Sequence, residues 1–366
     1  MATRDYRDST NGGGVKVIGD QEMKRLLEQG FTEGLATSLN ELQNHFPLRI
    51  WVVDNSGSMA NTDGHRIVPS KNNTDVKIVG CTRWKEIQEC VDYHVQISAM
   101  LHAPTVFRLL NNPGVSAGSQ EFDIATKGED MIPSDVSNAM NIMSRTRPSG
   151  CTPLTEHITE IHSSISAMKE SLQSEGKRAV VVLATDGLPT NEYGECNSYI
   201  KDSFVRSLKK LEGLPVWLVV RLSTDEEDVV DFYNSLDDQL ELSMDVLDDF
   251  CGEAAEIYEH NPWMNYALPI HRLREMGFHD RVLDMIDERP LTHAEIRDYC
   301  LLLFGANKCD GLPDPSIDWG AFASNVNQLL SEEKLQWNPM KKKMMPLIDM
   351  KKLNKKYGDK DGCILM

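Results

Sequence analysis

The fold of this chain follows from residues 49–58, which read Arg-Ile-Trp-Val-Val-Asp-Asn-Ser-Gly-Ser. The first half is apolar and rich in β-branched residues, a pattern that predicts a short buried strand. The second half consists of turn-forming residues, so a loop opens directly after Val53. Such a strand is typical of a parallel sheet, in which ligands collect at the loops that follow the carboxyl ends of the strands.

Helix and strand patterns alternate from this strand onward. The expected helices are 84–101, 134–144, 153–173, 199–211, 228–240 and one that begins near Asp249. The expected further strands are 105–110, 121–125, 178–185, 216–222 and 244–247. The run 179–184 is continuously apolar, as in a strand that is buried on both faces. The alternation predicts an α/β domain with a doubly wound, mostly parallel, Rossmann-like sheet.

The other segments have different compositions. At roughly 100–200 residues per domain, a chain of this length has room for about two or three domains. We expect a flexible N-terminus over 1–20, a helical arm over 21–45, the α/β domain over 46–261, a small helical appendage over 262–338, and a Lys-rich, structure-poor tail over 339–366. Within the domain, residues 60–82 are polar with two strand-like runs, which predicts a hairpin insertion.

Composition restricts the class of protein. The 366 residues include 38 Lys and Arg and 56 Asp and Glu, so the formal net charge is 38 − 56 = −18. This charge suits an acidic soluble protein and argues against general nucleic-acid binding. No stretch of about 18 apolar residues is present, and the start lacks the apolar core of a secretory signal, so we expect a cytosolic protein. The eight cysteines form no CxxC pair and are expected to be reduced.

Three loops that adjoin the predicted strands and helices carry oxygen-bearing side chains. Asp54, Ser56 and Ser58 follow the first strand, Thr152 precedes the helix at 153, and Asp186 ends the central apolar strand. Taken one at a time, these residues fit an Asx turn, a helix cap and a β-turn. Taken together, they offer two carboxylates and three hydroxyls at one edge of the sheet.

In order and spacing, these five residues resemble the von Willebrand factor type A (VWA) family, whose metal-ion-dependent adhesion site (MIDAS) combines a DxSxS motif, a Thr and an Asp on three loops. The resemblance covers about 200 residues. It implies that Ser56, Ser58 and Thr152 ligate a metal through oxygen, and that Asp54 and Asp186 bind it directly or through water. It also implies a protein partner whose Asp or Glu carboxylate completes the metal shell. The insertion over 60–82 departs from the pattern and is expected either to cover the site as a lid or to reshape it.

Chemistry favours the same class of metal. Hydroxyl, carboxylate and water oxygens in an octahedral shell suit Mg²⁺ first, then Mn²⁺ and after it Ca²⁺, rather than zinc. Two aspartates formally cancel a divalent charge. The site is therefore expected to hold Mg²⁺ and to leave a position open to a ligand.

The C-terminal residues carry a lipidation pattern. Cys363-Ile364-Leu365-Met366 matches the C-a-a-X signal, and a final Met favours a farnesyl group on Cys363. Residues 341–366 contain eight lysines and three aspartates, or 8 − 3 = +5. One prenyl chain anchors weakly, and a polybasic segment is the usual second signal for an anionic membrane. We expect a tether to the cytosolic face of a membrane; the alternative is a solvated tail with a chance match.

Other motifs are weaker or absent. Met276-Gly277-Phe278, followed by helical patterns over 279–288 and 293–304, resembles the loop of ubiquitin-associated domains, although a generic helix turn is the simpler interpretation. The sequence contains no phosphate-binding loop, nucleophile elbow or H-E-x-x-H pair, and no catalytic residues are predicted. The favoured function is a metal-dependent protein-binding module that is not an enzyme. The alternatives are a metal-dependent hydrolase, in which the ion activates a water, and a ubiquitin-linked adaptor.

Overall fold

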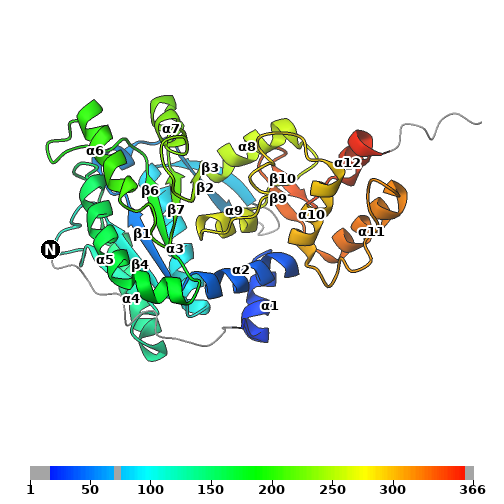
Figure 1. Cartoon of the computed structure of the whole chain (residues 1–366), viewed down its shortest axis with the longest axis horizontal. Coiled ribbons are helices and arrows are strands. Elements are labelled where there is room, and N and C mark those ends of the chain that lie inside the picture. Colours follow the sequence, from blue (N-terminus) through cyan, green and yellow to red (C-terminus); the bar gives the residue numbers. More distant parts are fainter. Residues whose placement is uncertain (1–16, 70–75, 359–366) are drawn as a thin grey trace, which may run out of the picture.

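A six-stranded sheet forms the centre of the α/β domain in a computed structural model that describes residues 17–69 and 76–358 (Figure 1). Its strand order is β5-β4-β1-β6-β7-β8, and every neighbouring pair is parallel except β4 and β5. The strands are β1 (Leu48–Val53), β4 (Thr105–Leu109), β5 (Glu121–Ile124), β6 (Ala179–Thr185), β7 (Val216–Leu222) and β8 (Met244–Leu247). The predicted α/β class and the mostly parallel sheet are confirmed.

Helices cover both faces of this sheet. They are α3 (Arg83–Met100) and α4 (Ile132–Arg145) on one face, and α5 (Leu154–Ser174), α6 (Ser198–Lys209) and α7 (Glu227–Asn234) on the other. Alternate residues of β1 enter the two cores: Ile50 packs with α5, whereas Trp51 packs with α3. Because both faces are covered, all six residues of β1 and all seven of β6 are buried. Helix α7 ends six residues before the predicted end, and turns complete the segment.

The insertion after β1 is a hairpin, as predicted. A short 3-10 helix (Gly57–Ala60) leads into β2 (Gly64–Pro69), which pairs antiparallel with β3 (Val76–Cys81). The hairpin lies along α3, where the backbone N–H of His65 donates to Glu86 at 2.9 Å and Arg66 pairs with Glu89 at 2.8 Å. These contacts fix the hairpin next to the carboxyl end of β1.

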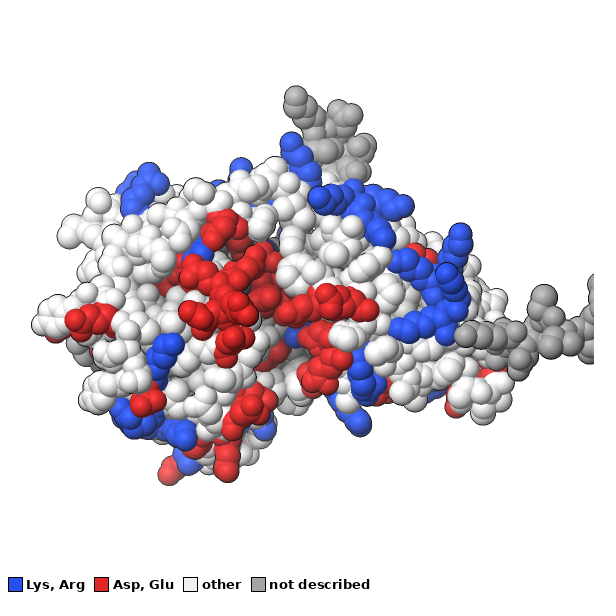
Figure 2. All heavy atoms as spheres, turned by 90° about the horizontal axis from the view of Figure 1, so that it is seen from above, with Lys and Arg blue, Asp and Glu red and all other residues white. Residues whose placement is uncertain are grey.

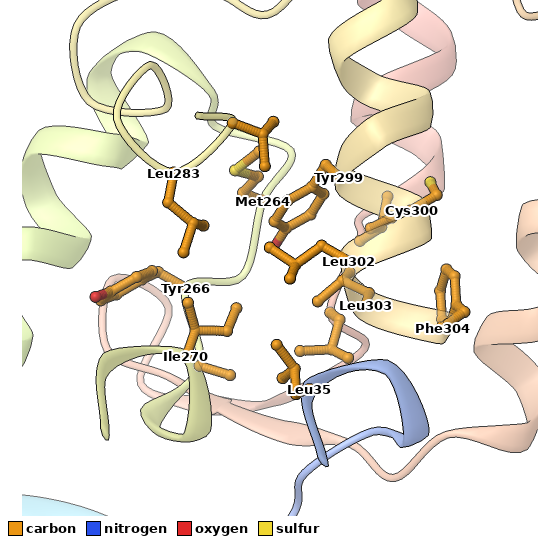
Figure 3. Close-up of a cluster of buried hydrophobic side chains, with 14 of the residues drawn as sticks. Leu35, Met264, Tyr266, Ile270, Leu283, Tyr299, Cys300, Leu302, Leu303 and Phe304 are labelled. Atoms are coloured by element: carbon orange, nitrogen blue, oxygen red, sulfur yellow. The ribbon is translucent and has the colours of Figure 1, made fainter. Parts of the chain in front are cut away.

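The N-terminal arm consists of two helices, α1 (Asp20–Glu28) and α2 (Glu33–His45), separated by Gly30 at φ +96°. Its apolar residues enter a core that they share with the C-terminal third of the chain, as Leu35 does beside Leu303 (Figure 3). The Thr32 hydroxyl donates to the Leu303 carbonyl, and Gly34 is so close to that backbone that a Cβ would collide with it. The first and last parts of the chain are therefore packed together.

The C-terminal third is mainly helical. Its elements are α8 (Phe250–His260), α9 (Leu268–Glu275), α10 (His293–Phe304), α11 (Trp319–Glu332), β9 (Gln336–Asn338), β10 (Lys343–Met345) and α12 (Met350–Tyr357). The helix expected over 279–288 is absent, because these residues form consecutive turns. Local turn bonds account for the difference: Asp280 Oδ1 accepts from the Val282 backbone N–H at 2.9 Å, and the Leu283 backbone N–H donates to the Asp280 carbonyl at 2.8 Å. Asn261 ties the end of the segment to the neighbouring chain by donating to the carbonyls of Ile286 and Arg289, both at 2.8 Å. The Met-Gly-Phe loop itself faces the sheet, with Met276 buried and Gly277 against Val180.

The segment after Pro339 was expected to be structure-poor, and this expectation is wrong for its described part. Residues 343–345 pair with β9, and α12 follows. Leu347, Ile348 and Leu353 are buried in the shared core. These few apolar residues are sufficient to dock a segment that is otherwise dominated by lysine. Cys363 lies outside the described residues. Over 17–69 and 76–358, no helix is both long and apolar enough to cross a membrane.

Candidate metal centre

Asp54 anchors a polar cluster at the carboxyl end of β1. Its backbone N–H still pairs with β6, donating to the Ala184 carbonyl at 2.8 Å. One carboxylate oxygen accepts from the Ser56 backbone N–H at 2.8 Å, which is the Asx turn expected for this loop. The other oxygen accepts from the Thr185 hydroxyl at 2.6 Å. The carboxylate is fully buried and is held by residues on both strands.

The two serines connect Asp54's loop to Asp186. Ser56 Oγ and Ser58 Oγ lie 3.1 Å apart, and the Ser58 hydroxyl donates to Asp186 Oδ1 at 2.8 Å. Asp186 is 1% exposed, whereas Ser58 lies at the surface. Four of the five predicted site residues therefore form one hydrogen-bonded cluster that is open to solvent on its Ser58 side.

Thr152 lies on an adjoining loop. Its backbone N–H donates to the Thr190 hydroxyl at 2.8 Å, and its own Oγ1 faces Gly187, where a Cβ added to that glycine would lie 3.8 Å away. The Gly57 backbone N–H donates to the Gly150 carbonyl at 3.1 Å, which ties this loop to the DxSxS loop. Asn111 strengthens the junction by donating to the Cys151 carbonyl at 2.7 Å. The topology brings all three predicted loops to one edge of the sheet.

The electrostatics of the cluster favour a cation. Burial, and after it the nearby Asp186 carboxylate, raise the pKa of Asp54 to about 6 against the lowering effect of the hydrogen bonds from Ser56 and Thr185. Burial likewise raises the pKa of Asp186. Two buried like charges next to three hydroxyl oxygens form a donor set of oxygens only, which is the set that Mg²⁺ prefers. The residues present therefore fit the metal that the resemblance implies.

Arg83 is the site residue that sequence reasoning missed. It begins α3 after the hairpin, its side chain is 2% exposed, and it donates to Asp186 Oδ2 at 3.0 Å. Asp63 holds the guanidinium in two hydrogen bonds of 2.7 and 2.6 Å, and Glu226 accepts at 2.7 Å. Hydrogen bonding to Asp63 raises the pKa of Arg83, so the charge is permanent. No local pattern could identify it, because Asp186 is 103 residues away.

Arg83→Met is expected to tighten Mg²⁺ binding by roughly tenfold or more, since the variant removes a fixed positive charge from Asp186. Asp63 and Glu226 are more than half exposed and would stay hydrated after the substitution. Isothermal titration with MgCl₂ measures the change. Arg66→Met, which removes a hairpin arginine paired to Glu89, is the matched control and should leave the affinity unchanged. Weaker binding in Arg83→Met would show that the guanidinium supports the site.

Comparisons with known proteins give little beyond the fold. No family model matches this chain, and no curated protein matches it. Among solved structures, the chain is similar to a point mutant of the PilB minor pilin from Streptococcus sanguinis. The identity is 14% and the TM-score 0.36, over 55% of this chain and 56% of that chain. This is a distant likeness of fold.

Proposed function

We propose that this protein is a VWA-like binding module that uses a divalent metal, Mg²⁺ in the first place, to bind a protein partner. The observation that carries the proposal is the cluster of two buried carboxylates and neighbouring hydroxyls at the carboxyl edge of the sheet. Asp54, Ser56, Ser58, Thr152 and Asp186 would hold the ion. When bound, the ion would supply a Lewis acid that accepts an Asp or Glu carboxylate of the partner.

The contacts of the cluster suit binding better than hydrolysis. Apart from the predicted ligands, the side chains that hydrogen-bond the two aspartates in the described part of the chain are Thr185 and Arg83. An arginine does not give up its proton near neutral pH, and a threonine hydroxyl is a poor base. General acid–base catalysis requires a proton carrier whose pKa lies near the working pH. We therefore propose recognition, with metal-dependent hydrolysis as the outcome that would overturn this choice.

Metal binding is tested by the melting temperature. Mg²⁺ at 100 times its Kd should stabilise the wild-type protein by about 2.7 kcal/mol, because the ion binds only the folded state. Asp186→Ala should abolish most of this increment, and Asp238→Ala, at an exposed position, should keep it. Partners captured by the wild type should be lost both with EDTA and with Asp186→Ala. Calorimetry without any Mg²⁺ binding to folded wild type would refute the proposal, as would turnover that is lost in Asp54→Ala.

The membrane tether is a second part of the proposal. Basic side chains gather toward the right of Figure 2, the side on which α12 lies in Figure 1. Lys342, Lys343, Lys351 and Lys355 are exposed, whereas Lys352 donates to Tyr258 at 2.8 Å. We propose that the exposed lysines contact an anionic membrane and that a prenyl group on Cys363 supplies the lipid anchor.

Replacing Lys342, Lys343, Lys351 and Lys355 by Gln is expected to weaken binding to anionic vesicles by roughly 1,000-fold, since each of the four lysines near such a surface contributes about 1 kcal/mol. The remaining binding should be less sensitive to salt. The matched control replaces Lys209 and Lys210, which are exposed at the end of α6 in the α/β domain.

Cys363→Ser should release the protein from membranes of a eukaryotic host. Equal membrane recovery of wild type and Cys363→Ser would contradict the tether.

A further inference from the structure

Two helices that face each other carry a second set of metal-ligating side chains. Cys90 and His94 are four residues apart on α3, and His271 and Glu275 are four residues apart on α9. Residues at this spacing lie on the same face of a helix. All four side chains are buried, with exposures of 1%, 1%, 1% and 0%. The cluster belongs to neither the candidate metal centre nor its loops.

The four side chains converge on the carboxylate of Glu275. Its Oε1 lies 3.4 Å from Cys90 Sγ and 3.3 Å from His271 Nε2, and its Oε2 lies 2.9 Å from His94 Nε2. One ligand atom each from Cys90, His94 and Glu275 lies within 4.8 Å of the others. His271 Nε2 is buried and makes no hydrogen bond of good geometry within the described residues, although the other ring nitrogen is 3.2 Å from the Tyr266 hydroxyl.

Two of these separations match the edge of a tetrahedral zinc site. With metal–ligand bonds of about 2.0–2.3 Å, ligand atoms around zinc lie roughly 3.3–3.6 Å apart. The Glu275 contacts to Cys90 and His271 have this length, and the contact to His271 is long for a neutral N–H···O hydrogen bond. We infer that Cys90, His94 and Glu275 form a zinc site that joins α3 to α9, with His271 beside Glu275 as the fourth side chain of the cluster.

The donor set selects zinc over the hard cations. A thiolate, an imidazole and a carboxylate are typical ligands of zinc, whereas Mg²⁺ and Ca²⁺ require oxygens. Burial lowers the pKa of His94 and of His271, so both rings are neutral and have a lone pair to donate. Cys90 enters as a thiol and gives its proton to solvent when the metal–sulfur bond forms, so the net gain of the site is 2 − 1 = +1.

Two arginines set the charge around this site. Arg272 donates to Glu275 Oε2 at 2.7 Å, and Arg221 pairs with Glu86 at 2.5 Å and lies 3.5 Å from Glu275 Oε1. Arg272 would thus hold the carboxylate oxygen that faces away from Cys90, as outer-shell partners of zinc ligands commonly do. The two arginines oppose the addition of positive charge. Zinc binding releases the Cys90 proton and adds only +1, whereas Mg²⁺ would release no proton and add +2, so the arginines also favour zinc. A cavity of about 260 Å³ lined by Cys90, His271 and Arg272 offers an entry path.

The position of the site indicates its role. Helix α3 belongs to the α/β domain, and α9 belongs to the C-terminal third, so one ion would bridge parts of the chain that are about 180 residues apart. Such a bridge stabilises the folded state by the free energy of metal binding. The inference does not depend on the proposed function, because its four residues are separate from the five that would hold Mg²⁺.

Cobalt in place of zinc tests the inference on the full chain. A cysteine ligand gives Co²⁺ a sulfur-to-metal charge-transfer absorption in the near ultraviolet, which an all-oxygen site cannot produce. We expect this band in the wild type and in Asp186→Ala, in the presence of excess Mg²⁺. Cys300→Ser, which replaces a buried cysteine on α10 away from the cluster, should keep it. Cys90→Ser should lose the band. It should also lower zinc affinity by more than roughly 100-fold, because the loss of a direct ligand costs more than the loss of an outer-shell partner.

Absence of the band in folded wild type, or its persistence in Cys90→Ser, would overturn the zinc site. If Cys90→Ser does not fold, X-ray absorption of the zinc-loaded wild type replaces it. Sulfur at about 2.3 Å from zinc supports the site, whereas a shell of oxygen and nitrogen alone refutes it. Loss of the band in a folded Asp186→Ala variant would also count against the zinc site, because Asp186 is not one of its ligands.

Discussion

Replacing Asp54 by Asn is expected to stabilise the metal-free protein by about 1–3 kcal/mol at neutral pH and to abolish its response to Mg²⁺. The side chain is fully buried, with Asp186 beside it. Asparagine keeps the shape and the oxygen that accepts from Ser56, but it removes a buried charge. A substitution that raises stability while it removes metal binding is the mark of a site built for a cation.

The sign of the pH dependence follows from the pKa of Asp54, which burial raises from 3.8 to about 6. The folded protein holds this proton more tightly than the unfolded chain does. The contribution of Asp54 to stability is therefore greatest below about pH 4 and is lost as the pH rises through about 6. The difference between Asp54→Asn and wild type should be small at low pH, grow across this window and stay constant above it.

Urea unfolding in EDTA at a series of pH values measures the difference, and addition of Mg²⁺ measures the metal response. Asp238→Asn, at an exposed position, is the control and should match wild type at every pH. A less stable Asp54→Asn at neutral pH, or one that still gains stability from Mg²⁺, would contradict the assignment of Asp54 to the metal.

Glu275→Ala is expected to destabilise the protein by about 3–5 kcal/mol, because it leaves buried charges without their partner. Glu275 is 0% exposed and lies within 3.5 Å of Arg221, Arg272 and His94. Desolvation alone would raise the pKa of its carboxyl, but Arg272 and the other partners hold that pKa well below its usual range. The ionised carboxylate is thus balanced by the arginines, and Arg272 loses the anion that it pairs with when the carboxylate is removed.

Chemical denaturation in EDTA without added zinc measures this effect, so it does not depend on the zinc site. Glu275→Gln keeps the shape and should destabilise by less than Glu275→Ala. The control Glu170→Ala, on the exposed face of α5, should lie within about 0.5 kcal/mol of wild type. A Glu275→Ala variant as stable as wild type would show that the buried charges find other partners.

Much of the fold could be predicted because its determinants are local. The apolar run of β6 and the turn residues after β1 specify strand and loop within a few neighbouring residues. Parallel strands then bring their following loops to one edge, which is why Asp54 and Asp186 could be expected to meet. The helix expected over 279–288 is wrong because the Asp280 carboxylate accepts from the Val282 backbone N–H, and the turns that begin there take the place of a helix.

Local sequence patterns were sufficient for the α/β class, the approximate strand boundaries and the five oxygen-bearing side chains at the sheet edge. Tertiary packing was needed to show that Arg83 pairs with Asp186, that Cys90 meets Glu275, and that α2 shares a core with α10. The physical reason is distance along the chain. Apolar periodicity and turn residues report on neighbours within one element, whereas a buried ion pair or a shared core is selected by the free energy of packing the whole molecule.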